Sequence, residues 1–589
     1  MKILSTLAII LALMAPGLSA GPKTSPEVDN MAPGTRASVI VRYKTPPGLA
    51  HAAKAKAKGL DAKKRLPLID GVVLAGSRAE IRALIAADPD IAYVSPDRKV
   101  RGSLDYANPT TGADIAFRSA WTGQGIGIAV VDSGVAAHWD LKDRIVYNES
   151  FVGGSATDEF GHGTHVAAII AGNGGLSNIG TATFRGIAPK ANIVNLKVLD
   201  SQGASSDSIV VAAIERAIQL RKKYNIRVMN LSLGRPVMDT YSNDPLCIAV
   251  EKAWNAGIVV VVAAGNFGRD DTFGNKGYGT IASPGNDPYV ITVGAMKTMT
   301  TANRGDDLIA SYSSKGPTAI DHIVKPDLVA PGNRIISALV TGSYLAETYP
   351  ANRISKDYYL PAAGSSPSNL YFRLSGTSMA SPMVSGAAAL MLEKDSGLSP
   401  DTVKARLMLS ATKQFPTASV ATDPVTGQTF TSQYDVFTIG AGYLDIPGAL
   451  ANSETFSKKL SAVSPPAVYD PATGQVLLVT SDSGLWGSTN LSGTSAVWGS
   501  AAAWGTSAVW GSSAVWGSAA AWGTSAIWGA AAAWGTNGTD AFTAIWGTAA
   551  AWGTSSTTST STTRVSYTSA FAGPAFDATQ ISIAINGEN

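Results

Sequence analysis

Nearly continuous apolar runs alternate with helical segments across the middle of the chain. The apolar runs, which we expect to be strands, cover residues 125–131, 192–198, 227–233, 258–263 and 290–293. The helical segments between them cover residues 164–170, 207–224 and 247–256. Strands without polar alternation are typical of a sheet that is covered on both faces, and the strand–helix alternation favours parallel order. We therefore predict an α/β fold with a parallel sheet flanked by helices on both faces.

Polar residues stand where two of these strands end. Asp132 directly follows the first apolar run, and Asn266 follows the run at 258–263 after Gly265. The carboxyl ends of the strands are where such sheets bind their ligands. A third polar residue, His162, begins a helix of small residues in the stretch GHGTHVA. We expect these side chains to meet at one edge of the sheet.

Ser378 lies in the stretch SGTSMASP, just before a run of small apolar residues at 380–392 that predicts a helix. At a helix N-terminus, unpaired N–H groups and the helix dipole stabilise an oxyanion that forms beside the hydroxyl. A serine becomes a good nucleophile only when a base takes its proton. The chain supplies these groups in the order Asp132, His162, Asn266, Ser378, and the order Asp, His, Ser is that of subtilisin.

The sequence resembles the subtilisin-like serine proteases, the subtilases or peptidase S8 family, over roughly residues 110–450. The matching stretches are VVDSGV, GHGTHVA, NLSLG, AAGN and SGTSMASP. Their chemistry assigns Asp132 to orienting His162, His162 to accepting and returning the Ser378 proton, and Asn266 to holding the oxyanion with the Ser378 N–H. The resemblance implies a secreted serine endopeptidase that hydrolyses peptide bonds through an acyl-enzyme.

Substrate binding is also implied by the resemblance. Two segments match those that line the specificity pocket of the family, namely Ser232, Leu233 and Gly234, and Ala263, Ala264 and Gly265. A protein or peptide substrate is expected to lie extended beside the first segment and to bind through main-chain hydrogen bonds. The small amount of charge at the pocket borders favours a large apolar or aromatic residue before the scissile bond.

The chemistry requires no cofactor, but the resemblance raises the question of a structural calcium ion. Many subtilases bind calcium near an aspartate in an H-x-D-L stretch, and Asp140 stands in HWDL here. Residues 173–181 offer further carbonyl oxygens. Calcium takes six to eight oxygen ligands, which a sequence does not count. Asp140 is therefore the one metal ligand that we name, and the presence of calcium stays open.

The N-terminal region has the parts of an exported precursor. Residues 1–20 combine Lys2, an apolar core and the small-residue site LSA, which predicts a cleaved signal peptide with an uncleaved anchor as the alternative. The core is too short for a transmembrane anchor. Residues 21–104 are expected to be a propeptide, since residues 37–100 resemble the inhibitor-type propeptide of subtilases. The expected strands and helices there cover residues 37–43, 50–64, 71–74, 79–87 and 91–94.

This propeptide would cover the active site and then be cut off near residues 100–108. A permanent N-terminal domain is the alternative. The catalytic domain is expected at residues 105–452, followed by a connector at 453–480.

A tryptophan repeat occupies residues 481–553. Ten of the thirteen tryptophans fall there on a six-residue grid, in about twelve copies of the unit WG[ST]xAx. The repeat is interpreted as a flexible tail that binds a surface, a glycan or itself, as a β-repeat with tryptophan ladders, or as a secretion or processing tag. Residues 554–589 form a Ser/Thr-rich tail, in which 579–585 alternate like a strand.

Net charge and cysteine content limit the classes of function that we expect. The net charge of +3 is small for 589 residues, so no nucleic-acid partner is expected. With a single cysteine, Cys247, the chain cannot form an intramolecular disulfide. The alternative from another class is a surface adhesion protein with an inactive protease domain. The presence of all four residues Asp132, His162, Asn266 and Ser378 argues against it.

Overall fold

The computed structural model describes residues 23–479 and 578–588 with short gaps. The gaps are at residues 25, 30, 33, 67–69, 97–101, 104–105, 179–181, 273, 361–362, 455, 457–460 and 471–474. The predicted signal peptide, the tryptophan repeat and most of the Ser/Thr-rich tail lie outside the described residues. The chain divides into two compact units, Met1–Val100 and Arg101–Asn589. Within the described ranges we find no helix with the length and apolarity of a membrane span.

The first unit is a four-stranded antiparallel sheet with two helices. Its strands, in the spatial order β2-β3-β1-β4, are β1 Arg36–Tyr43, β2 Asp61–Leu66, β3 Gly71–Ser77 and β4 Ile91–Pro96. Helices α2 (Leu49–Ala57) and α3 (Arg78–Ala87) accompany them, after a short α1 (Pro26–Asp29). The core is formed by alternate strand residues such as Val39 and Val41 with Ile81 and Leu84 of α3.

One predicted element of this unit is wrong in part. The helix expected over residues 50–64 ends at Ala57, and residues 61–66 form strand β2. Gly59 has φ +83°, a left-handed conformation that ends the helix and turns the chain back to pair with β3. The lysines of residues 63–64, interpreted as a solvated helix face, are exposed strand residues instead.

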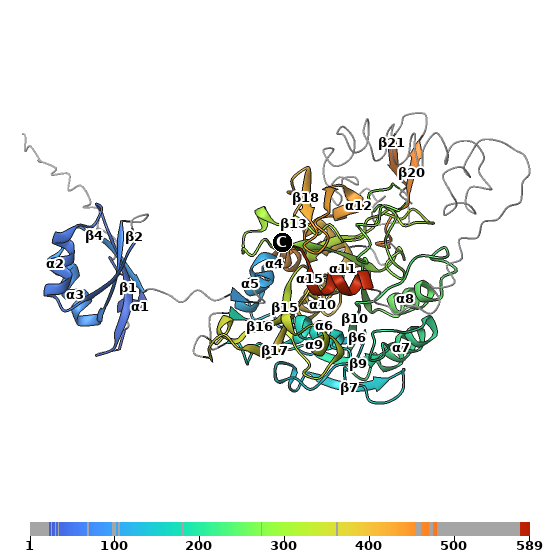
Figure 1. Ribbon diagram of the computed structural model, residues 1–589, viewed down its shortest axis with the longest axis horizontal. Coiled ribbons are helices and arrows are strands. Elements are labelled where there is room, and N and C mark those ends of the chain that lie inside the picture. The colour runs from blue at the N-terminus through green and yellow to red at the C-terminus, as the bar shows by residue number, and fades with distance from the viewer. Residues whose placement is uncertain are drawn as a thin grey trace, which may run out of the picture. The chain divides into compact units, whose positions relative to one another are not determined.

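The second unit is built on an eight-stranded sheet (Figure 1). Its strands are β6 Gly127–Asp132, β7 Ile145–Ser150, β9 Asn192–Lys197, β10 Ile226–Leu231, β11 Val259–Ala263, β12 Ile291–Lys297, β13 Leu308–Ile309 and β14 Leu328–Pro331. They run in the order β13-β12-β11-β10-β6-β9-β7, with β14 beside β12. All pairs are parallel except β12 with β13.

The sheet is therefore mixed, which corrects the prediction of an all-parallel sheet. Strand β13 follows β12 after only a short connection, Thr298 to Asp307, which contains a single 3-10 turn. A parallel return needs a crossover of a dozen residues or more, so this short return is antiparallel. The α/β class itself is confirmed, because the central strands are buried on both faces and flanked by helices.

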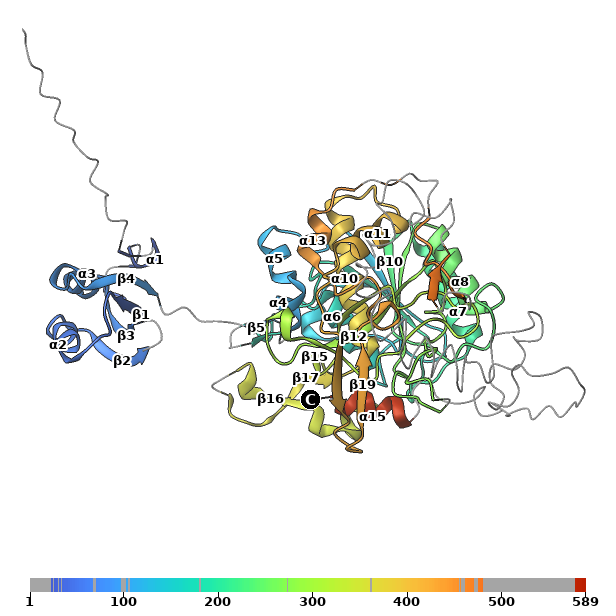
Figure 2. The same cartoon turned by 90° about the horizontal axis from the view of Figure 1, so that it is seen from above.

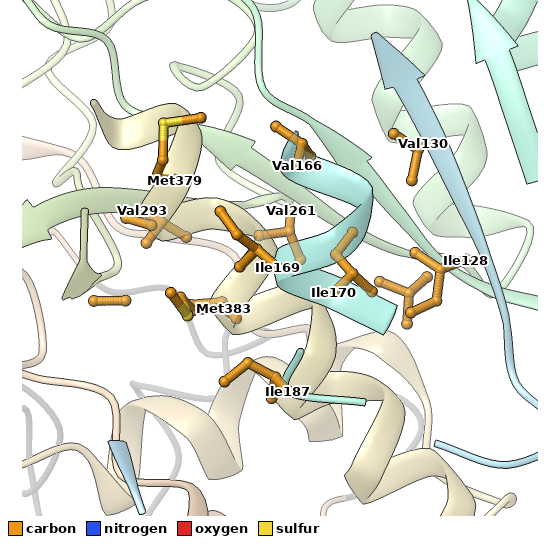
Figure 3. Packing of buried hydrophobic residues seen from close by; sticks show 14 of the residues in the cluster. Ile128, Val130, Val166, Ile169, Ile170, Ile187, Val261, Val293, Met379 and Met383 are labelled. Carbon is orange, nitrogen blue, oxygen red and sulfur yellow. The ribbon is translucent and has the colours of Figure 1, made fainter. Parts of the chain in front are cut away.

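Two pairs of helices cover the sheet. Helices α6 (His162–Ala171) and α10 (Thr377–Lys394) pack on each other and on the central strands, and α7 (Asp207–Leu220) packs on α8 (Pro245–Asn255). In Figure 2, α7 and α8 lie on one side of the strands, and α6 and α10 lie on the other. Figure 3 shows the core between α6, α10 and the sheet. It contains residues from both helices and from the strands beneath them, Ile128, Val130, Val166, Ile169, Ile170, Val261, Val293, Met379 and Met383.

Smaller elements complete the second unit. They are β15 Ile335–Ala338, β16 Arg353–Ser355, β17 Pro367–Leu374, the hairpin β18 Ala418–Thr422 with β19 Thr429–Gln433, α11 Pro400–Ser410, α13 Ile446–Ala451, the hairpin β20 Ala467–Asp470 with β21 Gln475–Leu478, and α15 Ala578–Asn586. The second hairpin lies inside the predicted connector. Residues 579–585 belong to helix α15, so the predicted strand is wrong. Within α15 the adjacent residues Ile583 and Ala584 are both buried and Asn586 is exposed, which differs from the alternation that the isoleucines suggest.

Candidate active site

Asp132 and His162 meet at the end of strand β6. Asp132 Oδ1 lies 2.8 Å from His162 Nδ1, and each residue is 1% exposed. The same carboxylate oxygen accepts the N–H of Ser133 at 2.7 Å, and the carbonyl of Asp132 accepts N–H bonds from Val198 and Leu199. Asp132 is thus held by its backbone carbonyl on the strand side and by its carboxylate on the turn side, and the carboxylate points at the first residue of α6.

The contact between Asp132 and His162 is possible because the backbone at the start of α6 lies close to the turn that follows β6. A Cβ on Gly163, the residue after His162, would lie 2.2 Å from the carbonyl oxygen of Gly134 and 3.1 Å from Asp132 Cβ. A side chain at position 163 would push α6 away from the β6 turn. The glycine of the GHGTH stretch therefore sets the distance between Asp132 and His162.

Asp158, which sequence reasoning missed, joins the two segments that carry Asp132 and His162. Its Oδ1 accepts the Ser133 hydroxyl at 2.8 Å and the Gly161 N–H at 2.7 Å. Its Oδ2 accepts the N–H and the hydroxyl of Thr164, each at 2.8 Å. Burial raises the pKa of Asp158, and these hydrogen bonds oppose the rise. The signal in the sequence is a single Asp four residues before His162 in a segment without periodicity, which does not distinguish it from a turn residue.

His165 has a different environment from His162. Its Nε2 lies 3.2 Å from the carbonyl oxygens of both Ile335 and Phe372. Burial and the neighbouring His162 lower the pKa of His165 to about 3. A neutral, fully buried imidazole that donates to backbone carbonyls is a structural group, which agrees with the interpretation of His165 as a packing and hydrogen-bonding residue.

Ser378 is the second residue of α10, and it faces the residue that follows strand β10. Its hydroxyl donates to the carbonyl of Ser232 at 3.2 Å, and the Ser232 hydroxyl donates to the Ser378 carbonyl at 2.9 Å. Ser232 Oγ also lies 2.9 Å from Ser381 Oγ, one turn further along α10. These bonds fix the N-terminal turn of α10 to the end of β10, and α10 packs on α6, the helix that begins with His162.

Asn266 lies next to the chain segment that precedes Ser378. Its Oδ1 accepts hydrogen bonds from the N–H of Thr377 at 2.9 Å and from the Thr377 hydroxyl at 3.1 Å. A Cβ on Gly376 would lie 3.2 Å from Asn266 Nδ2. The amide is therefore oriented, with its oxygen on Thr377 and its NH₂ group toward Gly376. Thr377 is a second residue that sequence reasoning missed, because a threonine in SGTSMA carries no signal of this role.

The two expected substrate-binding segments lie beside each other at the carboxyl end of the sheet. The ladder of β10 with β6 and β11 ends at Leu231, so Ser232, Leu233 and Gly234 lie beyond it. Gly234 and Gly265 both face Ala282, since a Cβ on either would lie within 3.2 Å of Ala282 Cβ.

The second expected substrate-binding segment, residues 263–265, is hydrogen-bonded on both sides. Ala264 donates its N–H to Val293 and accepts the N–H of Ala282, and Gly265 donates its N–H to the Thr377 hydroxyl. Ala263 ends strand β11.

Asp140 is buried, and each of its carboxylate oxygens accepts a hydrogen bond. Its Oδ1 accepts the N–H of Leu176 at 3.1 Å, and its Oδ2 accepts the hydroxyl of Tyr371 at 2.6 Å. Burial and the nearby Asp140 carboxylate raise the pKa of Tyr371, which keeps this hydroxyl a donor. A hydrogen-bond donor on each oxygen competes with a cation for the carboxylate lone pairs, and we find no cluster of three acidic, His or Cys side chains in the described part of the chain, which does not include residues 179–181 of the expected partner loop. These surroundings argue against calcium at Asp140, which stays an untested prediction.

Comparison with known proteins places this arrangement in a family. A sequence model of the subtilase family matches residues 123–442, more than half of the chain. Serine protease AprX of Bacillus subtilis (strain 168) is 38% identical over 333 residues, which cover 55% of this chain and 70% of that protein. Subtilisin DY of Bacillus licheniformis is 37% identical over 313 residues, 53% of this chain and 92% of that protein. The extracellular serine proteinase of Thermus sp. (strain Rt41A) is 34% identical over 343 residues, 56% of this chain and 68% of that protein.

The matched region contains β6, α6, β10, β11 and α10, the elements that contain or directly precede Asp132, His162, Ser232, Asn266 and Ser378. The fold and the family match thus cover the same residues. The chain belongs to the subtilase family and is a serine endopeptidase.

Proposed function

We propose that Asp132, His162 and Ser378 form the catalytic triad of this endopeptidase and that Asn266 supplies the side-chain donor of its oxyanion hole. The observation that carries the proposal is the 2.8 Å contact between Asp132 Oδ1 and His162 Nδ1 inside an almost completely buried site. A carboxylate at Nδ1 selects the tautomer that leaves Nε2 able to accept a proton. The placement of Ser378 at the start of α10, which packs on α6, supports the third role.

The reaction follows from these positions. Ser378 Oγ attacks the carbonyl carbon of the scissile peptide while its proton passes to His162 Nε2. Before the attack, the hydroxyl must turn from the Ser232 carbonyl, to which it donates at 3.2 Å, toward the imidazole. The Asn266 NH₂ group and the Ser378 N–H stabilise the oxyanion. Collapse expels the amine with the proton from His162, and water then hydrolyses the acyl-enzyme by the same route.

The proposed substrate is a protein or peptide in an extended conformation. Its backbone would pair with residues 232–234, which lie beyond the ladder of β10. The residue before the scissile bond would enter the space bordered by Gly234, Gly265 and Ala282. The absence of a charged side chain among these borders favours a large apolar or aromatic group.

We also propose that the chain is made as an exported precursor. The predicted signal peptide at residues 1–20 and the extracellular character of the Thermus relative support export. The compact N-terminal unit, which ends at Val100, supports a propeptide that folds as a body of its own and inhibits the enzyme until it is removed. N-terminal sequencing of the mature enzyme would locate the cut, which we expect at residues 100–108. The tryptophan repeat carries no cluster of acids, bases or metal ligands, so we assign it to binding rather than to chemistry.

The triad is tested with the purified chain and its Ser378→Ala variant. We expect the wild type to shorten itself, to cleave casein and to react with a fluorophosphonate probe, and we expect Ser378→Ala to do none of these. Ser396→Ala is the control, because it removes an exposed hydroxyl just beyond the same helix and should keep probe labelling. Wild-type protein that stays at full length, spares casein and takes up no label would refute the proposal.

A further inference from the structure

The last residues of the chain pack into the second unit. Helix α15 (Ala578–Asn586) is followed by Gly587 and Glu588, and both of these residues are buried. The helix contacts β17, and its residues Ile583 and Ala584 are 4% and 6% exposed. We call residues 583–588 the C-terminal clasp.

Glu588 is the most strongly bound residue of the C-terminal clasp. Its Oε1 accepts Arg269 Nη2 at 2.8 Å and the N–H of Ser311 at 2.9 Å, and it also accepts the Ser311 hydroxyl. Its Oε2 lies 3.1 Å from Lys297 Nζ. The carboxylate is 0% exposed and Lys297 is 3% exposed, so these charges depend on one another.

The backbone of Glu588 is held as firmly as its side chain. The N–H of Glu588 donates to Asn333 Oδ1 at 2.9 Å, and the Glu588 carbonyl accepts Asn333 Nδ2 at 2.8 Å. Gly587 has φ +59°, and a Cβ at that position would lie 2.4 Å from Ser375 Oγ. The site therefore binds the N–H, the carbonyl and the carboxylate of Glu588, and it leaves no room for a side chain at position 587.

Two of the segments that the clasp touches lead directly to the proposed active site. Arg269 lies three residues after Asn266, and its guanidinium joins Glu588 to Asp423 of the loop between β18 and β19. Ser375 lies three residues before Ser378, and its N–H donates to the carbonyl of Ala584 at 2.8 Å. One short segment thus binds the loop of the oxyanion donor and the strand end that leads to the nucleophile.

We propose that the C-terminal clasp positions Asn266 and Ser378 relative to each other, with Glu588 as the positioning residue. This proposal rests on the catalytic roles assigned above. Without the clasp, Arg269 and Lys297 lose their shared carboxylate, and Ser375 loses the acceptor of its N–H. Both loops then move independently, and small displacements of reacting groups lower the rate strongly. Because β21 and α15 both belong to the second unit, residues 480–577 are joined to this unit at both ends.

The first experiment measures docking without activity. In the full chain with Ser378→Ala, a recognition sequence for a site-specific protease is inserted between Thr563 and Arg564, and complete cleavage is verified by mass spectrometry. We expect the C-terminal fragment to coelute with the rest of the protein in size-exclusion chromatography. With Glu588→Gln added, we expect at least tenfold less of the C-terminal fragment to elute with the rest of the protein. Asn586→Ala is the control that should retain the fragment, because the Asn586 side chain is exposed and hydrogen-bonds to Ser582 within α15 rather than to the site that holds Glu588.

The second experiment measures positioning in the active full chain. We expect Glu588→Gln to lower kcat tenfold to a hundredfold per titrated active site, with KM within twofold of the wild type, and Asn586→Ala to change neither. A general loss of folded protein would lower the number of titrated sites instead. If Glu588→Gln does not fold, the double variant Glu588→Gln with Lys297→Met, which also removes the buried ammonium, takes its place.

The two experiments separate the two proposals. Separation of the fragment from the cleaved protein with intact Glu588, or an unchanged kcat in Glu588→Gln, would overturn the clasp and leave the triad standing. A retained fragment in Ser378→Ala together with an inactive wild type would overturn the triad and leave the docking standing.

Discussion

The amide oxygen of Asn266 accepts two hydrogen bonds from Thr377, one from its N–H at 2.9 Å and one from its hydroxyl at 3.1 Å. Thr377 immediately precedes Ser378, so the residue that orients the proposed oxyanion donor is covalently joined to the proposed nucleophile. The hydroxyl of Thr377 also accepts the N–H of Gly265, which borders the expected substrate pocket. One side chain thus connects the pocket, the oxyanion donor and the start of α10.

The hydrogen bonds between Asn266 and Thr377 predict that substitutions of these two residues lower kcat to different extents. Asn266→Ala removes the donor, and we expect kcat to fall about 10²- to 10³-fold, the cost typical of one oxyanion-hole donor. Thr377→Val keeps the N–H but loses the hydroxyl, and we expect a fall of about tenfold because one of two orienting bonds remains. Both are measured as kcat per active site on a peptide substrate. Thr377→Ser restores the hydroxyl and should recover most of the rate, and equal activity of the valine and serine variants would contradict the orienting role.

Asp158 should matter for both stability and rate. Asp158→Asn keeps the shape of the side chain but replaces one acceptor oxygen by an NH₂ donor, which faces either the donors Ser133 and Gly161 or those of Thr164. We expect a loss of about 1–3 kcal/mol in the free energy of unfolding, the cost of buried groups left without partners. We also expect a lower kcat, because the Asp132 and His162 segments lose their shared anchor.

Thermal unfolding in the Ser378→Ala background and kinetics in the active chain measure these two effects. Asp143→Asn, at an exposed position, is the control and should change neither quantity. A variant at position 158 with wild-type melting temperature and wild-type kcat would show that the network is dispensable.

The surroundings of Asp140 predict that calcium removal at this site has no effect. A chelator should leave the melting temperature of the Ser378→Ala protein unchanged, because no bound ion contributes there through mass action. Tyr371→Phe should instead lower the stability by about 1–3 kcal/mol, since the buried Asp140 carboxylate loses its hydroxyl donor. Tyr358→Phe, at a more exposed tyrosine, is the control. Recovery of a chelator-induced loss by calcium, abolished in Asp140→Asn, would contradict our assignment.

His322 predicts a pH-dependent contribution to stability. Burial lowers the pKa of His322 to about 4 from an unfolded value of about 6.5. Between these values the unfolded state binds the proton and the folded state does not, so this group's contribution to stability falls as the pH decreases from 6.5 to 4. The loss amounts to about 3 kcal/mol at pH 4 by linkage.

The measurement is the difference in unfolding free energy between the Ser378→Ala protein and the same protein with His322→Gln. The glutamine does not titrate, so we expect the difference to shift by about 3 kcal/mol in favour of the variant between pH 7.5 and pH 4. Comparing the two proteins removes the contributions of other buried groups, such as Asp307, whose pKa burial raises to about 7. A difference that does not change with pH would show that His322 has the same pKa in the folded and the unfolded protein.

Several elements were predictable because they depend on short-range patterns. Apolar runs of four to seven residues located β6, β9, β10, β11 and β12, since strands buried on both faces have no polar alternation. The residues that end these strands, Asp132 and the nearby Asn266, were predicted from the same runs. Helices α6 and α10 were predicted from their small residues.

Other features escaped prediction because distant residues decide them. The antiparallel direction of β13 depends on a short return that no local period reveals. Helix α15 carries alternating isoleucines, and only its contact with β17 and the site of Glu588 selects the helix over a strand. The donors on Asp140 come from Leu176 and from Tyr371, which is more than 200 residues away in the chain.

The sequence by itself determined the α/β class, the family and the identity of the four proposed catalytic residues. Apolar runs and motifs are patterns of neighbouring residues, and the order of the motifs follows directly from the chain. Only the tertiary structure decided which groups hold those residues in place. Asp158, Thr377 and Glu588 act through hydrogen bonds between segments that are far apart in the chain. Such bonds form where the packed sheet and helices bring a buried donor and acceptor within about 3 Å, and no pattern within a segment encodes that meeting.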